Sequence, residues 1–200
     1  MHPDPHFRWN DDAAVRRFVE RRGFAVIFVA AGGSPRVVHT PVTWHGEALR
    51  FHFSNGNIAR GDVDGARALT VVQGPDHYVS PDWYASPAAG GQVPTWNYVA
   101  VELEGPLRAL GRDELIGQVE RLAEVHEGRL APKPAWTLDR LEEEKRDRML
   151  QKITAYEQRV DAIRTTVKLN QNKPKAEREA AAAALAAHGQ IEIADWMRAL

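Results

Sequence analysis

Short runs of β-forming residues, separated by Gly and Pro, fill much of this chain and limit the folds open to it. The clearest run, residues 24–30, is apolar throughout and ends at a Gly-Gly-Ser-Pro turn. Because helices do not alternate regularly with such runs, a parallel doubly wound sheet is disfavoured. The pattern predicts a mainly β fold of the α+β class: an antiparallel barrel with peripheral helices. Strands are expected over residues 24–30, 36–44, 48–53, 68–73 and 96–110, with one or two more over 153–169.

Proline and glycine mark three irregular places in this pattern. Pro41 removes a backbone donor inside a strand, so an edge position or a bulge is expected there. Gly105-Pro106 predicts a bend within the long strand that begins near residue 96. Residues 74–91 contain three Pro and are expected to form a loop, whose large aromatic side chains fold back over the rest of the protein.

Several segments show helical spacing of apolar residues or strong helix-forming composition. Gly23 and Gly128 stand where glycine commonly ends a helix, and Thr137 offers a cap for a charged segment. Pro174 suits the first turn of an alanine-rich segment. Helices are expected over residues 11–22, 112–127, 137–150, 174–187 and 192–200.

The length of 200 residues is enough for one domain with a helical appendage. We expect residues 1–170 to form a barrel domain with inserted helices. Residues 171–200 are expected to form a helical extension packed on that domain or on a dimer partner. No signal peptide or stretch of 18 apolar residues is seen, so we expect a cytoplasmic protein with no membrane partner.

The composition excludes several kinds of site. The chain has no cysteine, which rules out disulfides, thiolate nucleophiles and cysteine-ligated metal centres. Its formal charge of -1 provides no global field for nucleic acid. Neither HExxH nor GxSxG occurs, so a zinc protease site and a serine hydrolase elbow are disfavoured and no metal site is expected.

The stretch Val93 to Val101 places an X-Pro turn, an indole, an amide and a phenol at the start of an apolar strand. Trp96 and Tyr98 face one side of that strand and Asn97 faces the other. The alternative is that both aromatic residues are ordinary core residues. A planar anionic cofactor such as FMN is feasible here, because it needs aromatic walls, amides and phosphate donors. Candidate phosphate donors are Arg36, Thr40, Ser54, Lys168 and the run 170–173.

Five blocks of sequence resemble the PaiB-like FMN-binding negative transcriptional regulators. The blocks at 73–84 and 93–98 are together highly specific, whereas His39-Thr40-Pro41 alone is weak. In family order, the matching stretches are residues 38–42, 51–57, 73–84, 93–99 and 168–173.

This resemblance implies a split β-barrel like that of the pyridoxamine-phosphate-oxidase-like flavoproteins, in a homodimer with two FMN sites at the subunit interface. A barrel with an open seam has edges to cover, which favours dimerisation on physical grounds as well. The implied cofactor-binding residues are Arg36, His39, Thr40, Pro41, His52, Ser54, Asn57, Trp96, Asn97, Tyr98, Lys168, Gln171 and Asn172. Catalytic residues are not assigned.

The first functional hypothesis is a dimeric FMN-binding protein with a regulatory, redox-linked role. The alternatives are a flavin-dependent oxidoreductase of a small molecule and a heme-binding or heme-degrading protein, since split-barrel relatives bind heme and His and Tyr ligate iron. Two more are a DNA-binding repressor without cofactor and a barrel without ligand. Direct DNA binding has little support, because the helix expected over 174–187 carries only Lys175 and Arg178 beside acidic neighbours.

Overall fold

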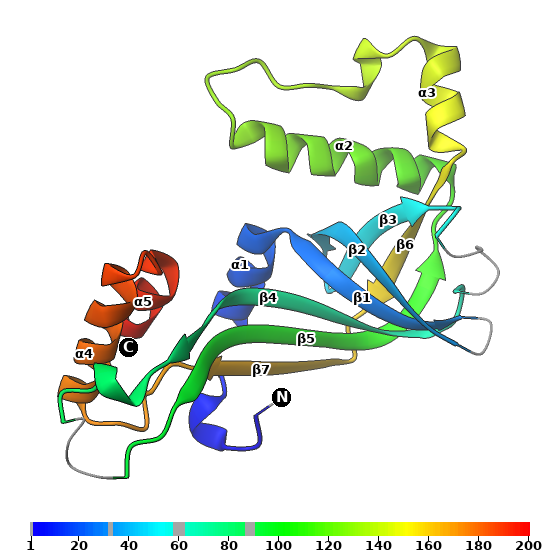
Figure 1. Ribbon diagram of the computed structural model, residues 1–200. Coiled ribbons are helices and arrows are strands. Elements are labelled where there is room, and N and C mark those ends of the chain that lie inside the picture. Colours follow the sequence, from blue (N-terminus) through cyan, green and yellow to red (C-terminus); the bar gives the residue numbers. More distant parts are fainter. Residues whose placement is uncertain (1, 32–33, 58–62, 87–90) are drawn as a thin grey trace. The chain divides into compact units, whose positions relative to one another are not determined.

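The computed structural model describes residues 2–31, 34–57, 63–86 and 91–200. Within these residues, seven strands form one sheet in the order β4-β1-β2-β3-β6-β5-β7. An additional pairing between β4 and β5 closes six of the strands on themselves (Figure 1). The strands are β1 Phe24–Ala31, β2 Ser34–His45, β3 Ala48–Ser54, β4 Arg67–Val79, β5 Thr95–Ala109, β6 Ile153–Arg159 and β7 Ala162–Lys168. The mainly β fold and all the expected strands are confirmed.

Five α-helices accompany the sheet in the described residues: α1 Asp12–Arg22, α2 Arg112–Gly128, α3 Glu143–Leu150, α4 Lys175–Ala187 and α5 Ile191–Arg198. One prediction was wrong in detail. Residues 137–150 do not form one helix; a 3-10 turn over Leu138–Arg140 is followed by α3. The backbone is extended at Leu141, which ends the 3-10 turn; Leu138 is buried, and the Thr137 side chain makes no cap hydrogen bond.

The chain divides into two compact units by its internal contacts. The terminal unit comprises residues 1–15, 73–101 and 164–200, and the central unit comprises residues 16–72 and 102–163. The expected division at residue 170 stays a prediction. No helix among the described residues is both long and apolar enough to cross a membrane.

The expected loop at residues 74–91 was partly wrong, because β4 continues to Val79. Trp96 of β5 holds the last residues of β4 in the extended conformation. The Trp96 indole N–H donates to Asp76 Oδ1 at 2.9 Å, and the rings of His77 and Tyr78 lie 6.5 and 6.3 Å from the Trp96 ring. Tertiary contacts therefore override the turn chemistry of Gly74-Pro75.

Pro41 lies where β2 changes partner, rather than at a free edge. It is the last residue of β2 in register with β1, opposite Phe24, and Val42 is the first in register with β3, opposite Phe51. The missing N–H therefore falls between the two ladders, where it disrupts neither.

The central unit is built around a stack of aromatic rings. Phe53 and Tyr156 lie 4.7 Å apart, with Phe51 at 6.3 Å from each. Helix α2 packs against β2, β3 and β6, as Figure 1 shows, and buries Leu115 and Leu122. In the terminal unit, α4 packs on α5, where the small side chains of the alanine run allow close approach of the helices.

An ion-pair network joins Glu114 at the start of α2 to the sheet. Arg108 donates to both Glu114 oxygens at 2.9 and 3.1 Å, and the Gly111 amide donates to the same carboxylate. These bonds lower the pKa of Glu114 from 4.5 to about 2. The carboxylate is one-third exposed, so we expect its contribution to be at most about 1 kcal/mol.

The pH dependence of stability follows from this lowered pKa. Because the pKa is depressed in the folded state, the stabilisation is complete above pH 4.5 and is lost as the pH falls toward 2. Glu114→Gln should therefore reduce the free energy of unfolding at pH 7, and its difference from the parent protein should shrink by pH 3. Urea titrations at both pH values measure this. Glu144→Gln, which removes an exposed i,i+4 pair, is the control; a constant Glu114→Gln effect would contradict the prediction.

Candidate functional site

The outer face of β1 and β2 in the central unit is apolar and exposed. Side chains alternate along β1, so Phe24 and Phe28 point outward with 54% and 41% of their surface exposed. The cross-strand partner of Phe28 is Val37, which is 50% exposed. Adjacent exposed apolar side chains of this kind make the face a candidate binding surface.

A histidine lies within this face. His39 is exposed and stands in register with Val26, between the Phe28–Val37 and Phe24–Pro41 pairs. Arg36 is also exposed, one residue before Val37. Two predicted site residues, His39 and Pro41, thus share the outer face of β2, whereas Arg36 has the strand parity of the buried Val38 and Thr40 and starts from the other face.

His52 holds a buried polar atom without a hydrogen-bond partner. Its Nδ1 has no partner among the described residues, and burial lowers the pKa of His52 from 6.5. The imidazole is therefore neutral at pH 7. Thr40, which is buried, donates its hydroxyl to the His52 carbonyl at 2.5 Å and fixes β2 against β3. A neutral imidazole with a free ring nitrogen is able to bond to a bound ligand.

Ser54 is the last residue of β3, Asn57 lies in the turn that follows, and both are exposed. Ser54 Oγ accepts from the Gly56 amide at 3.3 Å, which shapes the turn after the strand. Both side chains keep capacity to donate to an anion.

The remaining predicted site residues belong to the terminal unit. Trp96 is 51% exposed and shares a face of β5 with Tyr98, whereas Asn97 points inward and is fully buried. The Asn97 amide nitrogen lies 3.5 Å from Met197 Sδ, and its Oδ1 has no partner in the described part of the chain. The opposite orientations of Trp96 and Asn97 agree with the strand pattern.

Polar residues near the end of β7 are engaged by the terminal unit itself. Lys168 Nζ donates to Thr95 Oγ1 at 2.6 Å, and burial lowers the pKa of Lys168. The Gln171 amide donates to the carbonyls of Val167 and His6. Asn172 is exposed. Gln171 therefore has a structural role of its own, and Asn172 is the more available donor.

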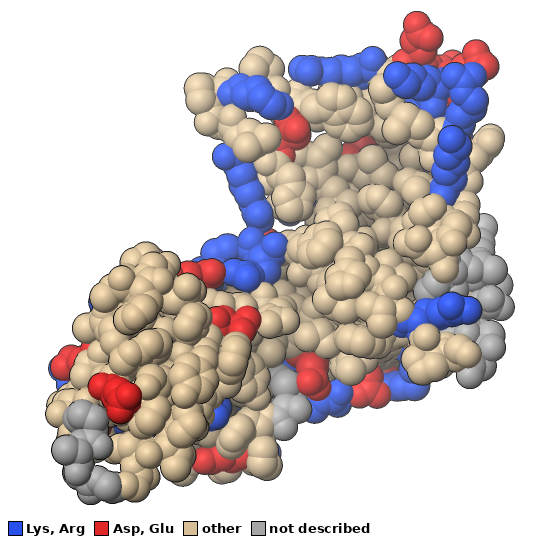
Figure 2. Space-filling view, in the orientation of Figure 1, with Lys and Arg blue, Asp and Glu red and all other residues tan. Residues whose placement is uncertain are grey.

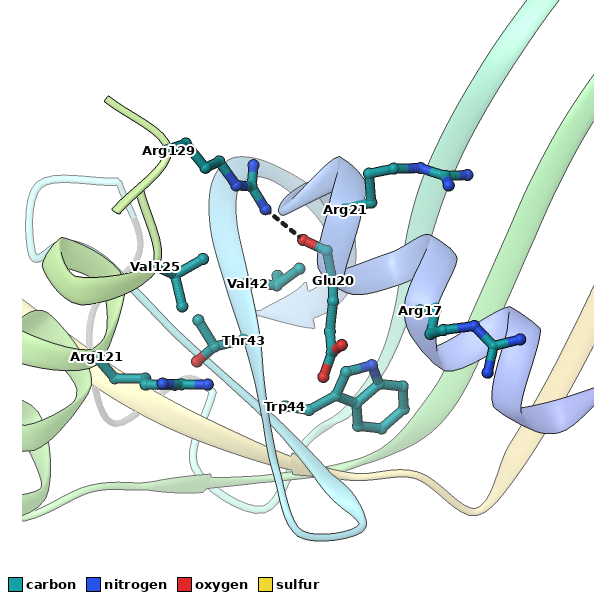
Figure 3. Close-up of a pocket in the computed structure, with 9 residues that line it drawn as sticks. All are labelled: Arg17, Glu20, Arg21, Val42, Thr43, Trp44, Arg121, Val125 and Arg129. Carbon is teal, nitrogen blue, oxygen red and sulfur yellow. Dashed lines mark hydrogen bonds between the residues drawn. The ribbon is translucent and has the colours of Figure 1, made fainter. Parts of the chain in front are cut away.

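A cavity of about 600 Å³ in the central unit contains none of the predicted site residues. It lies between α1 and α2 above β2 (Figure 3). The sequence feature that could have revealed this cavity is the spacing of arginines and apolar residues at i and i+4 along both helices. The lining residues are Arg17, Glu20, Arg21, Val42, Thr43, Trp44, Arg121, Val125 and Arg129.

A family model described as "Putative FMN-binding domain" matches residues 1–162. Among curated proteins, Protease synthase and sporulation protein PAI 2 from Bacillus subtilis (strain 168) is 26% identical over 178 residues, which cover 86% of this chain and 83% of the relative. The resemblance drawn from the five sequence blocks is thereby confirmed.

Solved structures share the fold at low sequence identity. The FAD and heme binding protein from Mycobacterium smegmatis aligns with a TM-score of 0.60 at 19% identity, over 88% of this chain and 79% of that one. The conserved hypothetical protein Rv2991 from Mycobacterium tuberculosis aligns with a TM-score of 0.61 at 12% identity, over 87% and 94%. The split antiparallel β-barrel is confirmed.

Proposed function

This chain belongs to the FMN-binding domain family, and from that premise we propose that it works as a homodimer which holds FMN on the outer face of β1 and β2 and acts in negative regulation of transcription. The observation that carries the proposal is the exposed apolar face of Phe24, Phe28 and Val37 around His39. Such a face is stable when a flat ring or a second copy of the chain covers it.

The residues of the central unit fit the cofactor. The apolar face suits the isoalloxazine ring, and the unpartnered Nδ1 of His52 suits a polar atom at the ring edge. Ser54 and Asn57 would supply a hydroxyl and an amide for the phosphate, and Arg36, at the exposed start of β2, would supply a cation. When bound, FMN supplies electron-transfer chemistry. The protein's part is to bind the ring, orient it and exclude water.

The terminal unit's residues remain proposed flavin contacts. Trp96 and Tyr98 would provide aromatic surface, and Asn172 and Lys168 would provide donors. Asn97 and Gln171 would act by holding β5 and the turn after β7 in place, since their side chains are engaged within the terminal unit.

A charge placed on the β1–β2 face tests both parts of the proposal. We expect Phe28→Lys to abolish the dimer and to weaken FMN binding by at least about tenfold, because a buried ammonium without a partner is costly. Quenching of FMN fluorescence measures binding, and light scattering measures mass. Met149→Lys is the matched control, since Met149 is an exposed apolar residue of α3 in the same unit. A Phe28→Lys variant that remains a dimer and binds FMN normally would contradict the proposal.

Heme is the second candidate ligand. The buried neutral imidazole of His52 is able to ligate iron, and one solved structure with this fold is described as a FAD and heme binding protein. A Soret shift on adding hemin, lost in His52→Ala, would support heme. Unchanged hemin absorption would remove this candidate.

The regulatory and redox roles are separable in solution. Reduction of bound FMN by a nicotinamide donor, followed by stopped flow, would favour a flavin-dependent oxidoreductase. Direct DNA contact would show as strongly salt-dependent binding. Helix α4 gives it little support, because Lys175 pairs with Glu179 at 3.6 Å on its surface. We propose that the protein regulates transcription through its flavin or through a partner rather than by direct DNA contact, and that it does so in the cytoplasm.

A further inference from the structure

The cavity between α1 and α2 has a basic rim. Arg17 and Arg21 come from one turn of α1, Arg121 comes from the facing side of α2, and Arg129 directly follows α2. Figure 2 shows basic side chains on both sides of the hollow between these helices. Figure 3 shows the guanidinium groups of Arg121 and Arg129 directed toward the cavity, and those of Arg17 and Arg21 directed away from it. One carboxylate, that of Glu20, points into the same space as the first two. The net positive charge attracts an anion.

The nearby acidic groups neutralise this rim only in part. Glu124, which is 70% exposed, pairs with Arg121 at 2.7 Å, as an i,i+3 pair on the helix surface. Such exposed pairs are weak and yield readily to a better partner. Arg129 donates to the backbone carbonyl of Glu20 at 2.8 Å, which positions the guanidinium at the cavity without cancelling its charge (Figure 3).

The floor of the cavity is apolar, apart from one unsatisfied donor. Val42 and Val125 face it, and the Thr43 hydroxyl is already used by Gln118 at 3.0 Å. The Trp44 Nε1 is buried and has no hydrogen-bond partner in the part of the chain that the structure describes. Arg16 lies 4.2 Å from the centre of the Trp44 ring and holds the indole in place.

We propose that this cavity binds a small amphipathic organic anion: an apolar, planar body on Val42, Val125 and Trp44, with its acidic group held by Arg121 and Arg129. The volume of about 600 Å³ lies within the range of small-molecule sites. An apolar floor beneath a rim of arginines suits such a molecule better than a nucleic-acid backbone, which requires a strip of charge without an apolar floor. The site is separate from the flavin face, because it shares no residue with it.

Fluorescence titration with 8-anilinonaphthalene-1-sulfonate, an apolar anion, tests the proposal. The protein is first saturated with FMN, so that the flavin face is occupied, and the neutral analogue N-phenyl-1-naphthylamine is titrated in parallel. We expect one sulfonate probe per chain, at least tenfold tighter than the neutral analogue, with affinity falling as salt rises. FMN should not displace the probe.

Matched variants assign the probe to the cavity. Arg121→Gln combined with Arg129→Gln should weaken sulfonate binding at least tenfold. Trp44→Phe should weaken it by a smaller factor, because the smaller ring offers less aromatic surface to the apolar body of the probe. Arg140→Gln combined with Arg148→Gln, which removes the same charge from exposed positions, should leave binding unchanged. Any one of three results would overturn the proposal: an equal loss of sulfonate affinity in both double variants, displacement of the probe by FMN, or equal affinity for the sulfonate and the neutral probe. Thermal unfolding checks that each variant is folded.

Discussion

Replacing Gly105 with Ala is expected to destabilise the protein by about 2–4 kcal/mol. A Cβ built at Gly105 would lie 1.7 Å from the carbonyl oxygen of Arg159. The backbone cannot move aside easily, because the Asp161 amide after Arg159 donates to the Glu104 carbonyl at 2.8 Å. The only relief is to part β5 from the turn that connects β6 and β7.

Gly117→Ala is the matched control for this substitution. Gly117 is exposed in the middle of α2, and a Cβ there would have no heavy atom within 4 Å. The Gly117→Ala substitution should raise the free energy of unfolding by about 0.5–1 kcal/mol, because alanine favours the helix more than glycine does. Urea unfolding followed by circular dichroism measures both variants. A Gly105→Ala protein as stable as the parent would show that the strands separate without cost.

Gln158→Leu is expected to cost about 3 kcal/mol, the second largest effect. Gln158 is fully buried between strands. Its amide nitrogen donates to the carbonyls of Ala68 and Leu103 at 2.9 and 3.2 Å, and its Oε1 accepts from Thr70 Oγ1 at 2.6 Å. Leucine has a similar volume, so the loss comes chiefly from polar groups left without partners.

A double-mutant cycle isolates the Thr70 bond. Thr70→Val removes the donor that Gln158→Leu leaves unpaired, so the double variant should be more stable than the sum of the two single effects predicts. Gln151→Leu, at an exposed position of the same unit, should change stability by less than about 0.5 kcal/mol. Chemical denaturation of the four proteins gives the coupling energy. Strict additivity would mean that the hydrogen bond contributes nothing measurable.

Local patterns in the sequence were sufficient for most elements. The apolar run that became β1 and the helical spacing that became α2 are properties of a few neighbouring residues, and both elements were predicted within two residues of their ends. The errors arose where distant residues decide. Asp76 and His77 are strand residues because Trp96 holds them. The helix that starts after Thr137 stops after one 3-10 turn, in which Leu138 is buried.

The candidate site shows the same division. Alternation along a strand predicted that Trp96 and Asn97 face opposite ways, which the structure confirms. The sequence did not reveal that His52 is buried with an unpartnered nitrogen, since burial depends on the strands beside it. The arginine-lined cavity was missed because its walls lie about a hundred residues apart in the chain.

The sequence by itself determined the mainly β class, most of the helices and the membership of an FMN-binding family, because these depend on short-range periodicity and on blocks of consecutive residues. Only the tertiary structure decided which polar groups are buried, which apolar side chains of β1 and β2 stay exposed, and which charges meet across the cavity. Those properties depend on strand register and helix packing, which place side chains from distant parts of the chain within a few ångströms of one another.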